Sequence, residues 1–230
     1  MYVFDAPKQA SLAVQGTDNR FPVRRIFCVG RNYEAHAREM GNDPDREPPF
    51  FFTKPADAVV DTPCTLAYPK LTENLHYEIE LIIAIGKGGS EIAEANVMDH
   101  VWGASVGIDL TRRDLQAEAK KMSRPWDWAK AFDQSAPIAP IKPIADVPSV
   151  EVGRIWLAVN GEVRQDADLA DLIWSVREHV SILSHAMTLA PGDIVMTGTP
   201  AGVGAVVPSD VIIGGVDGIA ELQVTIGPRA

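Results

Sequence analysis

Residues 76–83, His-Tyr-Glu-Ile-Glu-Leu-Ile-Ile, have the composition of a buried β-strand and yet carry two carboxylates, Glu78 and Glu80. Strand side chains alternate between two faces, so residues two positions apart leave the same face. Two like charges buried together are costly unless a cation or a proton compensates them. The alternative is an exposed strand face with solvated glutamates, and the adjoining apolar run Leu81–Ile85 argues against it. The pattern therefore predicts a strand that holds a shared cation.

A third carboxylate, Asp109, follows the small, apolar and β-branched segment 102–108, which is typical of a strand. Functional side chains often emerge where such a strand ends. Three carboxylates form an all-oxygen site, which suits Mg²⁺, Mn²⁺ or Ca²⁺ rather than zinc. For Asp109 alone, the alternative is a charge stabilised by the dipole at a helix N-terminus.

The composition excludes several classes of protein. The chain has 230 residues and a net charge of -10, which opposes binding to nucleic-acid phosphates. Cys28 and Cys64 lack a metal-type spacing and are too few for a disulfide scaffold. Residues 1–13 lack a signal pattern, and no apolar stretch approaches the length of a membrane span. We therefore expect a cytoplasmic protein without nucleic-acid or membrane partners.

Short apolar segments separated by turn residues predict a β-dominated α+β fold with a few short helices. Residues 1–21 form a weakly patterned leader, and residues 22–230 form one domain. Strands are expected at 25–29, 50–54 (ended by Pro55), 75–85, 102–108, 155–159, 162–165 and 194–197.

Local signals place several turns and helix starts. Asn160-Gly161 predicts a tight hairpin. Ser175 with Glu178, and Thr111 with Asp114, resemble capping boxes that begin helices. A further short helix is expected over residues 33–40.

His36 and Glu39 lie three positions apart, so they share a face of that short helix. A carboxylate beside an imidazole fixes its tautomer and raises its basicity, as a general base requires. A solvated pair on a helix surface is the alternative.

Arg113 and Gln116 repeat that spacing just after Asp109, and Lys130 follows between aromatic residues. Cations near a metal site indicate an anionic substrate. Surface charge is the alternative for Arg113, and extension from an aromatic cluster is the alternative for Lys130. Residues 197–200, Thr-Gly-Thr-Pro, open a glycine-rich loop whose N–H groups could hold a carboxylate; a structural turn is the alternative.

In this order, these segments resemble the fumarylacetoacetate hydrolase family. The match extends over residues 22–227, and the combination is far more specific than any one piece. Within the family, segments 30–55 and 168–176 favour members that act on fumarylpyruvate. The matching segments are Gly30-Arg31-Asn32-Tyr33 with His36 and Glu39, His76–Glu80, Gly107–Asp109, Arg113–Gln116, Ala129–Phe132 and Thr197–Pro200.

The resemblance implies a mixed β-sandwich roll, a homodimer and a divalent cation, Mg²⁺ with Mn²⁺ as the alternative. It makes Glu78, Glu80 and Asp109 the metal ligands. It makes His36 and Glu39 the pair that activates water, carried on a lid at about residues 33–49.

The resemblance also assigns contacts to the substrate, a small dioxo acid. Arg113, Gln116, Lys130 and Thr199 are expected to touch it, and Lys130 to stabilise an enolate as it forms. Arg31 is a further candidate, because a substrate with a second carboxylate needs a second cation or donor. Arg124 is the other candidate for that far carboxylate, and a structural ion pair is the alternative for both arginines.

The implied activity is metal-dependent hydrolysis of a carbon–carbon bond in a 2,4-dioxo acid, with fumarylpyruvate giving fumarate and pyruvate. General acylpyruvate hydrolysis and oxaloacetate decarboxylation stay open, because both pass through a pyruvate enolate. A hypothesis of a different functional class is that the protein is non-catalytic and uses the metal only for stability. The pair His36 and Glu39 argues against that hypothesis, because a structural cation needs no base.

Overall fold

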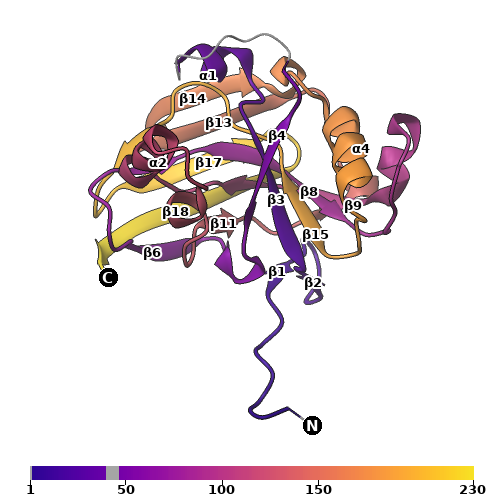
Figure 1. Ribbon diagram of the computed structural model, residues 1–230, viewed down its shortest axis with the longest axis horizontal. Helices are drawn as coiled ribbons and strands as arrows, with labels where there is room; N and C mark the ends of the chain where they lie inside the picture. Colours follow the sequence, from indigo (N-terminus) through magenta and orange to yellow (C-terminus); the bar gives the residue numbers. More distant parts are fainter. Residues whose placement is uncertain (1, 40–46) are drawn as a thin grey trace.

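A computed structural model of the chain describes residues 2–39 and 47–230. Two large sheets dominate it, and short helices lie around them (Figure 1). The predicted β-dominated α+β fold is therefore confirmed. The lid segment expected at residues 33–49 lies partly outside the described residues.

The larger sheet is mixed and carries the central strands of the molecule. β3 pairs in parallel with β15, which pairs antiparallel with β8, and β8 pairs antiparallel with β9. In spatial order the strands are β4 (Phe50–Lys54), β3 (Arg25–Gly30), β15 (Asp193–Met196), β8 (Ile79–Ile85), β9 (Val101–Ile108), β11 (Ala136–Ile138) and β5 (Val59–Asp61), with β12 (Lys142–Pro143) paired to β9.

A second sheet packs against the first, and two small sheets complete the strand structure. The second sheet runs β14 (Glu162–Asp168), β13 (Arg154–Val159), β17 (Val211–Val216), β18 (Ala220–Arg229) and β6 (Cys64–Tyr68). The small sheets are β10 (Thr111–Arg112) with β7 (Leu75–Tyr77) and β16 (Gly204–Val206), and the hairpin of β1 (Ser11–Ala13) with β2 (Arg20–Pro22).

The helices are short, as expected. The Ser175 hydroxyl caps α4 by accepting a hydrogen bond from the Glu178 N–H. The Glu178 carboxylate accepts a hydrogen bond from the Ser175 N–H in turn, so this capping box is confirmed. The helices are α1 (Glu34–Glu39), α2 (Arg113–Lys121), α3 (Asp127–Lys130) and α4 (Val176–Ala186), with 3-10 turns at Ala56–Ala58, Glu94–His100, Ile144–Asp146 and Leu169–Asp171.

Strand β8 separates two apolar clusters. Its odd-numbered residues, Ile79 to Ile85, pack into the core between the two large sheets. Its even-numbered residues Ile82 and Ala84 face the opposite side, where Leu12 and Phe21 of the N-terminal hairpin cover them. Glu80 shares that even-numbered face, so strand alternation directs it away from the inter-sheet core.

The hairpin at residues 11–22 was not predicted, because that segment has little hydrophobic pattern of its own. Leu12, Val14 and Phe21 are nevertheless buried and belong to the second apolar cluster. Residues assigned to the leader therefore help to close one face of the larger sheet. No helix within the described residues has the length and apolar character needed to span a membrane.

Two local predictions were wrong. The strand expected over 75–85 is interrupted at Glu78, so β7 and β8 belong to different sheets. Thr111 and Asp114 form no capping box: α2 begins without a side-chain cap, and Asp114 instead accepts hydrogen bonds from the Thr72 hydroxyl and the Glu73 N–H. The Asn160-Gly161 hairpin is confirmed, with both residues at positive φ between β13 and β14.

Candidate active site

Three buried carboxylates meet where β8 begins and β9 ends. Ligand atoms of Glu78, Glu80 and Asp109 all lie within 4.8 Å of one another. The interrupted strand still delivers this cluster, because the Asp109 N–H donates to the Glu78 carbonyl at 2.8 Å and extends the β8–β9 pairing by one step. At the break itself, the Ile79 N–H donates to the Gln165 side chain at 3.0 Å.

Two buried lysines accompany the carboxylates. Lys130 Nζ, on α3, lies 2.6 Å from both Glu78 Oε2 and Asp109 Oδ2. Lys54 Nζ, at the end of β4, lies 2.8 Å from Asp109 Oδ1 and also donates to the Leu110 and Lys130 carbonyls. Lys54 was missed in the sequence, although a lysine that ends a short aromatic strand before proline could have indicated a buried cation.

The carboxylates differ in their electrostatic environment. Burial opposes ionisation of Glu78, but the charges of Lys130 and Arg113 outweigh it and hold its pKa below the usual range. Burial raises the pKa of Glu80 well above the usual range, and the charges of Asp109 and Glu78 add to that rise. Burial lowers the pKa of Lys130, but the charges of Asp109 and Glu78 outweigh burial and raise that pKa above its usual value. The ammonium group therefore stays charged.

A divalent cation fits this donor set. Among the described residues, Glu80 has no cationic partner, and it accepts a hydrogen bond from the Gly198 N–H at 2.8 Å. Asp109 Oδ1 receives no well-directed hydrogen bond, because Lys54 directs its protons to carbonyl groups. Glu80 and Asp109 therefore each offer a carboxylate oxygen with spare acceptor capacity, and hard oxygen ligands of this kind are those that Mg²⁺ and Mn²⁺ prefer.

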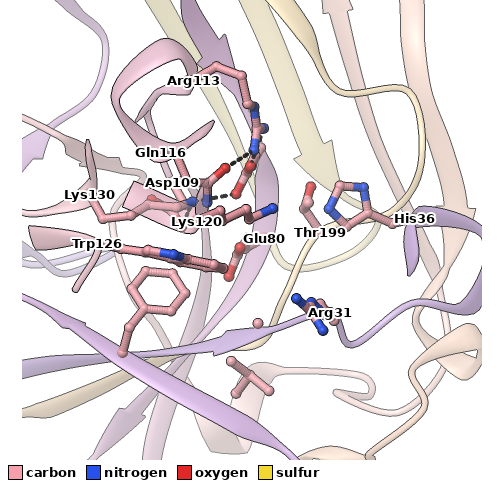
Figure 2. A pocket seen from close by; sticks show the side chains of 14 residues that line it. Arg31, His36, Glu80, Asp109, Arg113, Gln116, Lys120, Trp126, Lys130 and Thr199 are labelled. Atoms are coloured by element: carbon pink, nitrogen blue, oxygen red, sulfur yellow. Dashed lines mark hydrogen bonds and ion pairs between the residues drawn. The ribbon is translucent and has the colours of Figure 1, made fainter. Parts of the chain in front are cut away.

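The cluster forms the floor of an open cleft of about 430 Å³, a volume that includes solvent at its mouth (Figure 2). All the predicted substrate residues line it: Arg31, Arg113, Gln116, Lys130 and Thr199. The fold thus brings together, at this cleft, segments that are distant along the chain.

Arg113 is held by its neighbours. Its guanidinium forms an ion pair with Glu78, donates to Gln116 Oε1 at 2.6 Å and donates to His76 Nδ1 at 3.3 Å. Burial lowers the pKa of His76 to about 4, and the Arg113 charge contributes to this, so the ring stays neutral and can accept that hydrogen bond.

The glycine-rich loop after β15 lies beside the carboxylates. Its Gly198 N–H binds a carboxylate, as the sequence suggested, but that carboxylate is the protein's own Glu80. The Thr199 hydroxyl accepts a hydrogen bond at 2.8 Å from Gln165, whose amide also donates to the Pro200 carbonyl. Gln165 therefore fixes this loop against the start of β8, a role that nothing in the local sequence indicated.

His36 and Arg31 close the opposite side of the cleft. His36 is buried on α1 and lines the cleft, while Arg31 follows β3 with a φ of 59° and an exposed side chain. The side chain of Glu39 lies outside the described residues, so its pairing with His36 stays a prediction. Arg124 does not line this cleft and borders a neighbouring one beside β4.

Two further lining residues were missed in the sequence. Lys120 lies on α2 seven positions after Arg113 and four after Gln116, so helical spacing alone places it on the same face. Trp126, which precedes α3, packs on Phe50 with ring centroids 4.9 Å apart. Its contribution depends on the contact of α3 with β4, which no local pattern indicates.

Comparisons with known proteins agree with this site. Residues 25–227 match the family model for the C-terminal domain of fumarylacetoacetate (FAA) hydrolase. A fumarylpyruvate hydrolase from a Ralstonia species is 46% identical over 191 residues, which are 82% of this chain and 99% of the relative. The human mitochondrial oxaloacetate tautomerase FAHD1 is 40% identical over 199 residues, 86% of this chain and 90% of the relative.

A solved structure shares the whole fold. The crystal structure of fumarylpyruvate hydrolase from Pseudomonas aeruginosa, in complex with Mn²⁺ and pyruvate, is 53% identical to this chain. It aligns with a TM-score of 0.97 over all of both chains. The expected mixed β-sandwich roll is thereby confirmed.

Proposed function

This chain belongs to the fumarylacetoacetate hydrolase family, and we propose that it hydrolyses fumarylpyruvate to fumarate and pyruvate. The observation that carries the proposal is the buried cluster of Glu78, Glu80 and Asp109 at the floor of a cationic cleft. The similarity to two fumarylpyruvate hydrolases supports the choice of substrate within the family.

Glu78, Glu80 and Asp109 are the residues that hold the divalent cation, Mn²⁺ or Mg²⁺. When bound, the cation supplies positive charge that polarises a carbonyl oxygen and stabilises negative charge on an enolate. Lys130 adds a second, fixed positive charge at the same place. Its pKa is raised, so it remains protonated while negative charge develops in the cleft.

In this proposal, His36 acts on water. It lies on the opposite side of the cleft from Lys130, and in the proposal it takes a proton from the water that attacks the C4 carbonyl (Figure 2). The C3–C4 bond then breaks, its electron pair moves to C3, and the acyl part leaves as fumarate. The protonated His36 returns its proton to C3, which completes pyruvate. Glu39 orients the imidazole.

Arg113, Gln116 and Thr199 bind the 2-oxo acid end of the substrate. Arg113 lies against Glu78 and Gln116, so an arriving carboxylate meets a donor group already ordered by its neighbours. The Gln165 amide likewise fixes the Thr199 hydroxyl. Ordered donors lose little conformational freedom when they bind, which favours orientation of the reacting bond.

We further propose that the protein acts as a homodimer in the cytoplasm. Both cysteines, Cys28 and Cys64, are free, which suits a reducing compartment. Trp128 is 72% exposed and Met122 is 48% exposed, so each leaves apolar surface that a second copy could cover. Light scattering coupled to gel filtration tests the dimer, and a monomer at micromolar concentration contradicts it.

The experiment that tests the function follows the loss of dioxo-acid absorbance with fumarylpyruvate. Turnover is expected with Mn²⁺ or Mg²⁺ and is expected to stop with chelator or with Glu80→Gln. Glu221→Gln is the matched control, because Glu221 is an exposed carboxylate remote from the site in the sheet of β18. Full turnover after exhaustive chelation contradicts the proposal.

Oxaloacetate is the second candidate substrate, because the human relative with 40% identity is named an oxaloacetate tautomerase. Tautomerisation moves a proton at C3 and breaks no carbon–carbon bond, so the same base and cationic cleft can serve it. Decarboxylation releases CO₂ and pyruvate. Comparing kcat/KM for fumarylpyruvate and oxaloacetate decides which reaction dominates, and release of CO₂ separates the two oxaloacetate reactions.

A further inference from the structure

Lys120 is an ordered cation at the rim of the cleft. It lies in the last turn of α2 and is half-buried, and its Nζ lies 5.1 Å from the centroid of the Trp126 ring. That ring packs in turn on Phe50 and Phe52, at centroid distances of 4.9 and 5.7 Å. The aromatic cluster therefore limits where the ammonium group can go.

Lys120 has no carboxylate partner among the described residues, and neither does Arg31. The other two cations that line the cleft are both paired: Arg113 with Glu78, and Lys130 with Glu78 and Asp109. Lys120 is half-buried, and a charged side chain that gives up part of its contact with water is favoured by a nearby counterion. An unpaired lysine and an unpaired arginine at one cleft therefore indicate a missing anion.

Lys120 and Arg31 both extend their positive charge toward the same cleft. Burial lowers the pKa of Lys120, and the charges of Arg113 and Arg31 lower it further, so these cations are close enough to repel one another. Arg31 reaches the cleft from the other side, after β3, and both side chains point into it (Figure 2). Arg31 does so at a φ of 59°, a conformation uncommon for arginine and often associated with functional positions.

We propose that Lys120, together with Arg31, binds the carboxylate at the end of the substrate remote from the 2-oxo acid. This inference rests on the proposed function and assigns its substrate selectivity. The 2-oxo acid end is taken up at the floor of the cleft by Arg113 and its neighbours. The remote carboxylate lies at the opposite end of the substrate from that site, and Lys120 and Arg31 supply the opposite charge there.

This assignment replaces Arg124 by Lys120 in the pair of candidates that the sequence offered. Arg124 is exposed and borders the neighbouring cleft beside β4 instead. Lys120 also differs from arginines that have a carboxylate partner near the surface, such as Arg154 with Asp166 and Arg177 with Glu151.

The test compares a dicarboxylic with a monocarboxylic substrate. Lys120→Met keeps an unbranched side chain that can pack on Trp126 but removes the charge. A hydrogen bond to a charged group contributes enough that its loss lowers affinity by about ten- to a hundredfold. The ratio of kcat/KM for fumarylpyruvate to kcat/KM for acetylpyruvate is expected to fall by that factor in Lys120→Met and to recover largely in Lys120→Arg.

Lys121→Met is the matched control, because Lys121 is exposed and does not line the cleft, and it is expected to leave the ratio unchanged. A ratio within twofold of wild type in Lys120→Met overturns the inference. So does a parallel fall for both substrates, which would place Lys120 at their shared end or in the fold. Equal turnover of both substrates by the wild type also overturns it, while hydrolysis of dioxo acids as such would stand.

A binding measurement separates this inference from the proposed function. If the wild type cleaves neither substrate, the proposed function fails, and the Kd values of fumarate and crotonate for the Mn²⁺-loaded protein decide about Lys120. Crotonate carries a methyl group where fumarate has its second carboxylate. A preference for fumarate that is lost in Lys120→Met supports the inference, and equal binding of the two acids by the wild type overturns it.

Discussion

Replacing Lys130 by methionine tests whether a fixed ammonium group and a bound cation share the same carboxylates. Lys130 Nζ lies 2.6 Å from both Glu78 and Asp109, and all three side chains are buried. Removing one partner of a buried ion pair typically costs ~3–5 kcal/mol, because the remaining charges lose their compensation. We therefore expect Lys130→Met to be destabilised by about that amount when metal is absent.

The effect is large enough to measure by thermal unfolding. For a chain of this length, 1 kcal/mol corresponds to roughly 2–4 °C in Tm, so the variant should melt about 6–20 °C below wild type in chelator. Mn²⁺ should then raise the Tm more in Lys130→Met than in wild type. The added cation replaces the lost charge, and it no longer meets the repulsion of the ammonium group.

Lys121→Met is the control here as well, and it should behave like wild type with and without Mn²⁺. Two results would refute the reasoning. A Tm of Lys130→Met within 2 °C of wild type in chelator would show that the ion pairs contribute little, on the scale of roughly 2–4 °C per kcal/mol. An equal rise in Tm on adding Mn²⁺ to both proteins would show that Lys130 and the cation do not share these carboxylates.

Three further predictions follow from particular contacts. His36→Ala should lower kcat by about 10²–10⁴-fold while the Kd of oxalate, an enolate mimic, changes little; a parallel loss of oxalate binding contradicts the role of base. Burial lowers the pKa of His179 from its ordinary value of 6.5 to about 4. As pH falls, His179 is therefore protonated in the unfolded chain before it is protonated in the folded one. The free energy of unfolding is highest above pH 6.5 and decreases by ~3 kcal/mol in all as pH falls toward 4. His179→Gln should flatten the urea midpoint between these pH values, and an unchanged slope refutes this. Gln165→Leu leaves the Ile79 N–H and the Pro200 carbonyl without their hydrogen-bond partner, which should lower the free energy of unfolding by about 1–3 kcal/mol for each group. An unchanged urea midpoint would contradict this.

Features set by local pattern could be predicted from the sequence. Strand alternation placed Glu78 and Glu80 together, and ligand atoms of the two do lie within 4.8 Å of one another although the strand is interrupted at Glu78. The Asn160-Gly161 hairpin requires two residues at positive φ, which few other dipeptides tolerate. The Ser175–Glu178 capping box satisfies helix N–H groups within a single turn, so its signal is wholly local.

Features set by distant contacts could not be predicted. The break at Glu78 depends on Gln165, which is 86 positions from Ile79 in the chain and supplies the acceptor that a strand partner would otherwise supply. Lys54 reaches Asp109 because β4 pairs with β3, and nothing in its own segment specifies that neighbour. Asp114 had the spacing of a helix cap, but Thr72, 42 positions earlier, competes for its carboxylate.

Lys120 is an intermediate case. Its spacing from Arg113 and Gln116 was readable in the sequence, and the cleft does lie on that face of α2. What the sequence did not show is the position of Trp126. Its ring lies next to the Lys120 ammonium group because α3 packs beside β4. The pairing of His36 with Glu39 and the lid at about residues 33–49 remain predictions.

The most direct test of the central claim is hydrolysis of fumarylpyruvate in ¹⁸O-labelled water with Mn²⁺, followed by mass spectrometry of the products. We predict equimolar fumarate and pyruvate, with one ¹⁸O atom in each fumarate, because the attacking water becomes part of its new carboxylate. Glu80→Gln should give no product above the enzyme-free control. Absence of labelled fumarate with the wild-type protein, or an equal yield from Glu80→Gln, would contradict the claim that this carboxylate cluster carries the reaction.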